Sequence, residues 1–206
     1  MRKAIPILVL AAVCAAPVAA APPTLTLKAA TTVVAYGGST SLSGVLSTQK
    51  VGQAIDIQAQ DCGQTAFKKV ATATTTTAGA FSSAPKPTLN TSYQAKNKGS
   101  TSAIVAVKVT PLLSLQKLSL GKFKVSATAA QSFVGKYVVF QRLRNSKWVT
   151  LKKVTLATVA TTTAPTQVTS STFRIKLPAK LRIRSILPAT QAATCYLPVK
   201  SKVIRS

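Results

Sequence analysis

The sequence contains no histidine and only two acidic residues, Asp56 and Asp61, among its 206 residues. These absences exclude a Ser-His-Asp triad, a glycosidase carboxylate pair, a zinc cage of His, Cys and acidic ligands, and an acidic calcium site. A catalytic cysteine is excluded as well, because no histidine is present to activate its thiol. We therefore expect a protein that is not an enzyme and that uses no metal and no cofactor.

Residues 1–20 have the pattern of a secretory signal peptide. Arg2 and Lys3 give a positive start, a short apolar run follows, and small residues lead to a cleavage site after Ala20. The alternatives are a retained membrane anchor and a lipoprotein modified at Cys14. The preferred interpretation is a secreted, extracellular protein.

Long hydrophobic runs and aromatic residues are scarce in the rest of the chain. No apolar run beyond residue 21 is long enough to span a membrane, so the mature chain is expected to lack a transmembrane segment. Aromatic residues make up 5% of the sequence, so stacking on nucleic-acid bases would be weak. No recognition helix or zinc finger is readable, and together with the export signal this argues against intracellular nucleic acid as a partner.

The sequence contains an internal repeat. Residues 51–58 match residues 134–141 at a constant offset of 83 positions, and both segments begin with Val-Gly and end with Gln. The Lys-Lys-Val segment at 68–70 recurs at 152–154, one residue out of that register. Repetition in the same order at nearly the same spacing predicts two copies of one unit. The predicted domains are residues 22–109 and 110–206.

Both copies are predicted to be all-β. Short segments rich in Val, Ile, Thr and aromatic residues alternate apolar with polar positions, and Gly, Pro and Asp turns separate them. The strands expected in the first copy are 39–46, 54–60, 67–74, 91–97 and 104–110. Those expected in the second copy are 122–127, 136–143, 148–155, 172–177 and 180–187. Strands at this spacing indicate a sandwich or a barrel.

The first copy carries a recurring order of motifs. They are Tyr36-Gly37-Gly38, the strand segment 41–46, Val51-Gly52 with its Ile-x-Ile strand, the segment 67–72, Ala78-Gly79-Ala80-Phe81, and the segment 87–93. This order resembles the bacterial immunoglobulin-like domains found in tandem in secreted actinobacterial proteins. The resemblance covers nearly the whole first copy, but in the second copy only residues 125–154 and the surroundings of Phe173.

The resemblance implies two tandem immunoglobulin-like β-sandwiches. It implies little about function, because such domains serve as spacers, as adhesins and as carbohydrate-binding accessories. Family members often have an acidic residue before the glycine of the turn found here at Ala78-Gly79. In this chain the run Thr74–Thr77 precedes that turn, so a calcium-assisted turn is not expected.

Three types of side chain invite a functional interpretation. Tyr93, three residues after Asn90 at a strand entry, suits a tyrosine corner, whose hydroxyl bonds back to the preceding loop. Trp148 lies in an alternating strand, where core or sheet packing is preferred to an exposed role in stacking sugars or bases. Asp56 should point outward from a sheet and Asp61 should lie in the adjacent turn, so the two carboxylates should not converge.

Two cysteines, Cys62 and Cys195, remain once the signal peptide is removed. In an exported protein two thiols are more often bridged than free. An intramolecular bond would join the two predicted domains across their junction and is the preferred interpretation. The alternatives are an intermolecular disulfide and two free thiols.

Positive charge is concentrated in the second copy. Of the formal net charge of +25, the first predicted domain carries 8 Lys and 2 Asp (+6) and the second carries 17 Lys and Arg with no acidic residue (+17). Basic residues alternate along the predicted strands, which places them on one face of each strand, opposite Phe123, Leu143, Ile175 and Ile183. If neighbouring strands bring them together, they form one positive sheet face. The predicted anion-binding set is Lys122, Lys124, Arg142, Arg144, Arg174, Lys176, Arg182 and Arg184.

A net charge of this size destabilises the folded domain by repulsion between its cations, unless an anionic partner neutralises it. The sequence thus predicts a non-catalytic protein that associates with the cell surface or cell wall through its basic domain. The expected partner is an anionic extracellular polymer, either a teichoic-type polymer or an acidic polysaccharide; anionic lipid headgroups and extracellular DNA are further options. The alternative is a structural or assembly module that binds other secreted proteins through its sandwiches, with the charge incidental.

Overall fold

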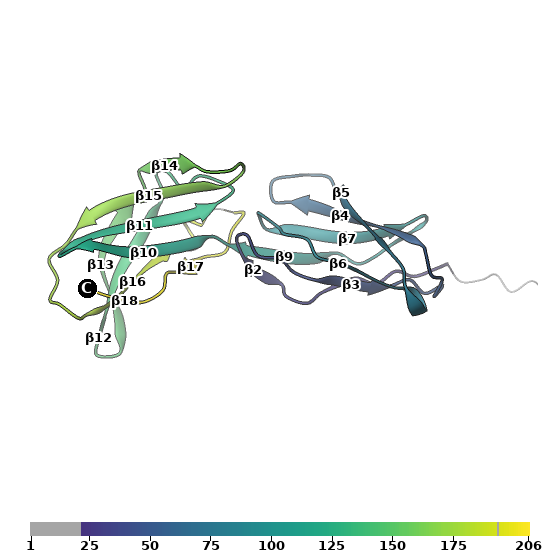
Figure 1. Ribbon diagram of the computed structural model, residues 1–206, viewed down its shortest axis with the longest axis horizontal. Helices are drawn as coiled ribbons and strands as arrows, with labels where there is room; N and C mark the ends of the chain where they lie inside the picture. The colour runs from purple at the N-terminus through teal and green to yellow at the C-terminus, as the bar shows by residue number, and fades with distance from the viewer. Residues whose placement is uncertain (1–21, 193) are drawn as a thin grey trace, which may run out of the picture.

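The computed structural model describes residues 22–192 and 194–206, and nearly all regular structure in them is β-strand (Figure 1). A short 3-10 turn, η1 (Thr77–Gly79), interrupts the strands. The predicted signal peptide, residues 1–20, lies outside the described residues. No described helix is long and apolar enough to cross a membrane.

The first half of the chain forms two facing sheets. One has the order β1-β3-β6 and the other the order β2-β9-β7-β4-β5, with β8 paired to β7. The pairs are antiparallel except for β2 and β9, which are parallel. The strands are β1 (Lys28–Ala29), β2 (Val33–Ala35), β3 (Leu42–Val45), β4 (Ala54–Asp61), β5 (Lys68–Thr74), β6 (Ala80–Ser83), β7 (Thr91–Asn97), β8 (Ser100–Thr101) and β9 (Val105–Thr110).

The second half forms another pair of sheets, both antiparallel. The β11 sheet has the order β10-β11-β15-β14, and the β16 sheet has the order β13-β12-β16-β17, with β18 also paired to β16. The strands are β10 (Leu112–Ser119), β11 (Lys122–Ala129), β12 (Tyr137–Arg144), β13 (Lys147–Thr155), β14 (Thr158–Thr161), β15 (Gln167–Arg174), β16 (Arg182–Leu187), β17 (Val199–Lys200) and β18 (Ile204–Arg205).

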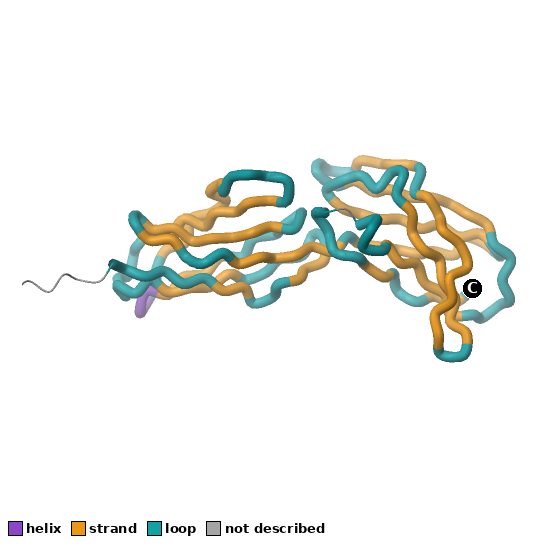
Figure 2. The backbone as a smooth tube through the Cα atoms, turned by 180° about the vertical axis from the view of Figure 1, so that it is seen from behind, coloured by secondary structure: helices purple, strands orange, loops and turns teal. Residues whose placement is uncertain are grey.

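The two sandwiches lie end to end along one axis (Figures 1 and 2). Within the described residues, each sheet draws its strands from one half of the chain only. β9 ends at Thr110 and β10 begins at Leu112, so a single residue, Pro111, separates the two sandwiches along the backbone. The chain is therefore a tandem of two immunoglobulin-like β-sandwiches.

The repeat seen in the sequence recurs in the strand ladders. β4 begins at Ala54 and β12 at Tyr137, 83 positions later. The ladder between β4 and β5 shifts register after Ile57, and the ladder between β12 and β13 shifts register after Phe140, again 83 positions later. The two copies thus share an irregularity as well as a strand order.

The cores of the two sandwiches have different side chains. Aliphatic residues dominate the first, in which Leu42, Ile55 and Ile57 are fully buried. The second is built on three phenylalanines at the facing surfaces of its two sheets, with ring centroids 5.0–5.8 Å apart. They are Phe123, Phe140 and Phe173.

All ten predicted strands correspond to strands of the structure; the bounds predicted for 91–97 match β7, and the other nine strands have shifted ends. The largest shift is at β15, which was expected at 172–177 and spans Gln167–Arg174. The strands that were not predicted are β1, β2, β6, β8, β10, β14, β17 and β18. Most of them are only two to four residues long; β10 was missed although it has eight. Its adjacent Leu112 and Leu113 obscure the alternation, since only Leu113 is buried.

Candidate functional site

The structure divides the eight residues of the predicted anion-binding set among three places. Lys122, Lys124 and Arg174 lie on the outer face of the β11 sheet, opposite to the buried Phe123 and Phe173, and Lys176 follows the end of β15. Arg182 and Arg184 lie on the outer face of the β16 sheet, on the other side of the sandwich. Arg142 and Arg144 lie on β12.

The expectation of one positive sheet face is therefore wrong. A period of two assigns a side chain to one face of its strand, but it does not assign the strand to one of the two sheets of a sandwich. Strands β11 and β15 belong to one sheet and β12 and β16 to the other, so their outer faces point in opposite directions.

The orientation expected for β12 is also wrong. Arg142 is paired with the buried Ile183, two residues after the buried Phe140, and so lies on the inner face of the β16 sheet; Leu143 is on the outer face, paired with Trp148. The Nε atom of Arg142 is buried and has no hydrogen-bond partner in the described part of the chain. The β12–β13 hairpin projects beyond the body of the sandwich (Figure 1), and on its inner face Arg142 is half-buried and Arg144 is exposed.

The outer face of the β11 sheet is basic at its end far from the first domain. Lys122 lies directly opposite Arg174 in the ladder, and Lys124 is in the next outward row. Nearer to the domain junction the same face is neutral: the hydroxyls of Ser114 and Ser126 are 2.8 Å apart. Positive charge on this sheet is therefore confined to one end.

A hollow of about 550 Å³ adjoins this basic end. It is lined by Leu120, Gly121, Arg174, Ile175, Lys176 and Leu177. Leu120, in the β10–β11 turn, is 79% exposed. The hollow therefore combines apolar side chains with two of the predicted anion-binding residues.

The outer face of the β16 sheet carries an ordered arginine. The guanidinium carbon of Arg184 lies 3.9 Å from the centre of the Trp148 ring, and its Nε donates a hydrogen bond of 3.0 Å to Oε1 of Gln141. The Gln141 amide nitrogen is in turn 3.4 Å from the Thr150 hydroxyl, to which it donates. Burial against these neighbours lowers the pKa of Arg184 from its usual value, yet a guanidinium remains charged at neutral pH.

The structure thus places Trp148 on a sheet surface and not in the core. It is half-buried, on the same outer face as Arg184, and the guanidinium covers one side of its ring. Sheet packing was one of the two packing roles expected for this residue. The sequence gives no sign of its arginine partner, because Arg184 is 36 positions away on another strand.

Like charges face each other repeatedly in the second domain. Three cross-strand pairs place two cations directly opposite: Lys122 with Arg174, Arg144 with Lys147, and Arg182 with Arg205. Like charges in this position destabilise a sheet. The amino acids of residues 110–206 include no side-chain carboxylate that could separate them.

In the first domain, the two carboxylates contact cationic or hydroxyl side chains. Asp56 is paired with Lys96 across the ladder and is 2.7 Å from the Nζ atom of Lys69. Asp61 accepts a hydrogen bond of 2.7 Å from the Thr91 hydroxyl. The two carboxylates do not converge, and no group of three or more potential metal ligands occurs in residues 22–192 and 194–206.

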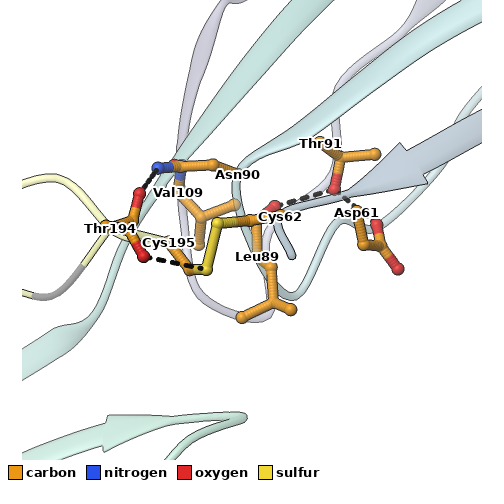
Figure 3. Close-up of a disulfide and its surroundings, with 8 residues drawn as sticks. All are labelled: Asp61, Cys62, Leu89, Asn90, Thr91, Val109, Thr194 and Cys195. Carbon is orange, nitrogen blue, oxygen red and sulfur yellow. Dashed lines mark hydrogen bonds between the residues drawn. A yellow bond between two sulfur atoms is a disulfide. The ribbon is translucent and has the colours of Figure 1, made fainter. Parts of the chain in front are cut away.

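Cys62 and Cys195 form an intramolecular disulfide that joins the two domains, as preferred from the sequence (Figure 3). Cys62 follows the end of β4, and Cys195 lies in the loop between β16 and β17, with their Cα atoms 5.3 Å apart. Such a bond is compatible with an extracellular protein.

Asn90 reinforces this junction from the first domain. Its backbone N–H donates to the carbonyl of Cys195 (2.9 Å), and its side-chain nitrogen donates to the carbonyl of Thr194 (3.3 Å). Its side-chain oxygen accepts from the N–H of Val109 (2.8 Å). A further bond between the domains joins the hydroxyls of Tyr36 and Thr166 at 3.0 Å. The junction is therefore held by a covalent bond together with hydrogen bonds from several segments.

The tyrosine-corner prediction is half correct. The Tyr93 side chain is buried, with 3% exposure, but within residues 22–192 and 194–206 its hydroxyl makes no hydrogen bond to the preceding loop. Burial, aided by the negative charge of Asp61, raises the pKa of Tyr93 to about 12. Tyr196 in the second domain makes a different contact: its hydroxyl accepts from the N–H of Ala130, in the loop after β11, at 3.0 Å.

Comparison with known proteins finds distant likenesses among solved structures. No family model matches the chain, and no curated protein matches it. A solved tetra-tandem repeat from the extending region of a large adhesion protein is 12% identical, with a TM-score of 0.37 over 90% of this chain and 49% of that one, so this chain spans about half its length. Bovine butyrophilin is 11% identical, with a TM-score of 0.33 over 87% of this chain and 98% of that one.

Proposed function

We propose that this chain is an exported, non-catalytic tandem immunoglobulin-like protein that associates with an anionic extracellular polymer through its basic second domain. The observation that carries the proposal is the set of three like-charge cross-strand pairs in a domain without side-chain carboxylates. Solubility alone needs only a modest net charge. Anionic groups of a bound polymer would convert each repulsive pair into a favourable contact.

Such binding is driven by electrostatic attraction and involves cations distributed over the surface of the second domain. Cations lie on both outer faces of the second sandwich, so a flexible polymer can contact either face. A teichoic-type polymer and an acidic polysaccharide both present repeated oxyanions outside a bacterial cell. Retention should fall steeply with salt, because exposed charges are screened within about 8 Å at physiological ionic strength.

The proposal is tested by retention of residues 22–206 on isolated bacterial envelopes across a salt series, before and after removal of their anionic polymers. We expect binding at low salt that is lost at high salt and lost with the polymers. Binding that ignores salt, or no binding at all, would contradict the proposal and favour a protein partner of the sandwiches.

Matched variants locate the binding surface. Four neutralising substitutions on the β11 side (Lys122, Lys124, Arg174 and Lys176 to Gln) or four on the β16 sheet (Arg182, Arg184, Lys200 and Arg205 to Gln) should each weaken retention. The control removes four exposed charges from the first domain (Lys28, Lys50, Lys86 and Lys98 to Gln) and should retain binding. Equal loss in the control would show that total charge, and not the second domain, determines association.

A further inference from the structure

The outer face of the β16 sheet holds a cation whose orientation is fixed without an acidic partner. The Arg184 guanidinium lies over the Trp148 ring, and its Nε donates a hydrogen bond to the side-chain oxygen of Gln141. In the part of the chain that the structure describes, neither terminal nitrogen of Arg184 donates a hydrogen bond. The N–H groups of the two terminal nitrogens therefore remain available to donate two parallel hydrogen bonds to two oxygens of one ligand group.

The first domain shows that the fold does not need a charge at this position. Gln58 and Gln94 are the equivalent pair in the ladder between β4 and β7, as Gln141 and Arg184 are in the ladder between β12 and β16. Gln94 donates to Gln58 at 2.7 Å, so two neutral amides satisfy each other. In the second domain, Arg184 takes the position of Gln94, so the neutral pair becomes a pair with a cation whose terminal N–H groups are still available.

Further cations lie on the same face within reach of a polymer. Arg182 is two residues from Arg184, and two residues along a strand span about 7 Å. Arg205 is directly opposite Arg182 on β18. An ordered arginine is thus followed along the sheet by a pair of facing arginines.

We propose that Arg184 is the specific oxyanion-binding residue of the second domain, holding a carboxylate or phosphodiester of the polymer in a two-oxygen contact while Arg182 and Arg205 bind the neighbouring anionic group. Trp148 and Gln141 are positioning residues that keep the guanidinium oriented. This inference rests on the proposed function, because it names the contact by which the basic domain recognises its polymer. It differs from that proposal in predicting one site that depends on geometry as well as charge.

Trp148 is the only tryptophan of the chain, so its fluorescence reports directly on this site. The experiment titrates residues 22–206 with polygalacturonate and, separately, with poly(glycerol phosphate), while cosedimentation measures total binding. The variants are Arg184→Gln, which copies the first domain, and Arg184→Lys, which retains charge without the planar fork. Lys50→Gln is the matched control, since it removes one exposed charge from the first domain; circular dichroism verifies folding of each variant.

We expect polymer to change the Trp148 emission of the unmodified protein and of Lys50→Gln, with dissociation constants that agree within about threefold, less than 1 kcal/mol. Both Arg184 variants should bind at least about tenfold more weakly, because hydrogen bonds to charged groups contribute about 1.5–3 kcal/mol. A response to one polymer alone would identify the oxyanion as carboxylate or phosphodiester.

Three results would overturn the inference. If Arg184→Gln binds as Lys50→Gln does, or if Arg184→Lys binds as the unmodified protein does, the ordered fork has no role, while charge-led binding stands. If the Trp148 emission is unaffected although the polymer cosediments, the polymer lies elsewhere. If neither polymer cosediments at low salt, the proposed function fails together with the inference.

Discussion

The two sandwiches share one ladder pattern but carry different side chains at its outward positions. In the first, the two carboxylates have a cationic or a hydroxyl partner, and the Gln58–Gln94 pair is neutral. In the second, the equivalent pair contains Arg184, and three ladder positions place cations opposite each other. The backbone pattern therefore leaves the surface chemistry free to diverge, because outward positions of a sheet are not constrained by core packing.

The same comparison explains how the domains are joined. β4 ends at Asp61 and the chain turns at Cys62, which is bonded to the second domain. The corresponding strand β12 ends at Arg144, 83 positions after Asp61, and a turn of Asn145 and Ser146, both with positive φ, leads directly into β13. The turn after β4 thus joins the two domains in the first copy, whereas the equivalent turn in the second copy joins two strands that carry basic residues and, on β13, Trp148.

The largest expected effect tests whether the two cores are independent. Phe140→Ala should destabilise the second domain by about 3–5 kcal/mol, and Ile57→Ala, at the equivalent position, should destabilise the first by about 2–5 kcal/mol. Denaturant unfolding followed by Trp148 fluorescence reports on the second domain, and circular dichroism reports on both. If Ile57→Ala shifts the fluorescence transition as much as Phe140→Ala does, the sandwiches unfold as one unit.

Removal of the disulfide tests the clamp between the domains. The double variant Cys62→Ser with Cys195→Ser should lower stability by about 2–4 kcal/mol, because the unfolded chain is no longer cross-linked. The fluorescence and circular dichroism transitions should also separate as the domains become uncoupled. Coincident transitions at an unchanged midpoint would mean that the Asn90 hydrogen bonds and the Pro111 connection hold the junction by themselves.

A pH titration compares two buried tyrosines, Tyr93, which the sequence analysis singled out, and Tyr196, which it did not. Burial raises the pKa of both Tyr93 and Tyr196 to about 12, above the value of about 10 in an unfolded chain. Their contribution to stability is therefore complete below pH 10 and is lost as the pH rises from 10 to 12. Tyr93→Phe and Tyr196→Phe should each show a shallower decline in this range, measured by denaturant unfolding; an unchanged slope would contradict the assignment.

The smallest effect is expected from exchanging the equivalent surface residues. Arg184→Gln should change the stability of the second domain by about 1 kcal/mol or less, since a cation–π contact at an exposed site contributes roughly 0.5–1 kcal/mol. Gln94→Arg in the first domain should be tolerated similarly, because its position also faces outward. Thermal unfolding measures both; a loss of several kcal/mol in Arg184→Gln would show that the arginine is required for folding.

The strand pattern was predictable because it depends on local alternation and turns. Ala54–Asp61 and Thr91–Asn97 were located within one residue from the run of β-branched and apolar side chains. Short edge strands such as β1 and β17, with two residues each, offer no period to detect. The two β12 arginines were assigned to the wrong face because Leu143, the apolar residue between them, packs outward at the end of the hairpin.

The sequence by itself determined the β class, the two copies, the excess of positive charge in the second copy and the cysteines available for a bond. These properties follow from composition, repetition and local periodicity, which need no knowledge of distant contacts. Only the tertiary structure decided which sheet each strand joins, and therefore that the basic residues divide between opposite faces. It also decided that Trp148 lies beneath Arg184, because side chains on strands far apart in the chain meet only when the ladder sets their register.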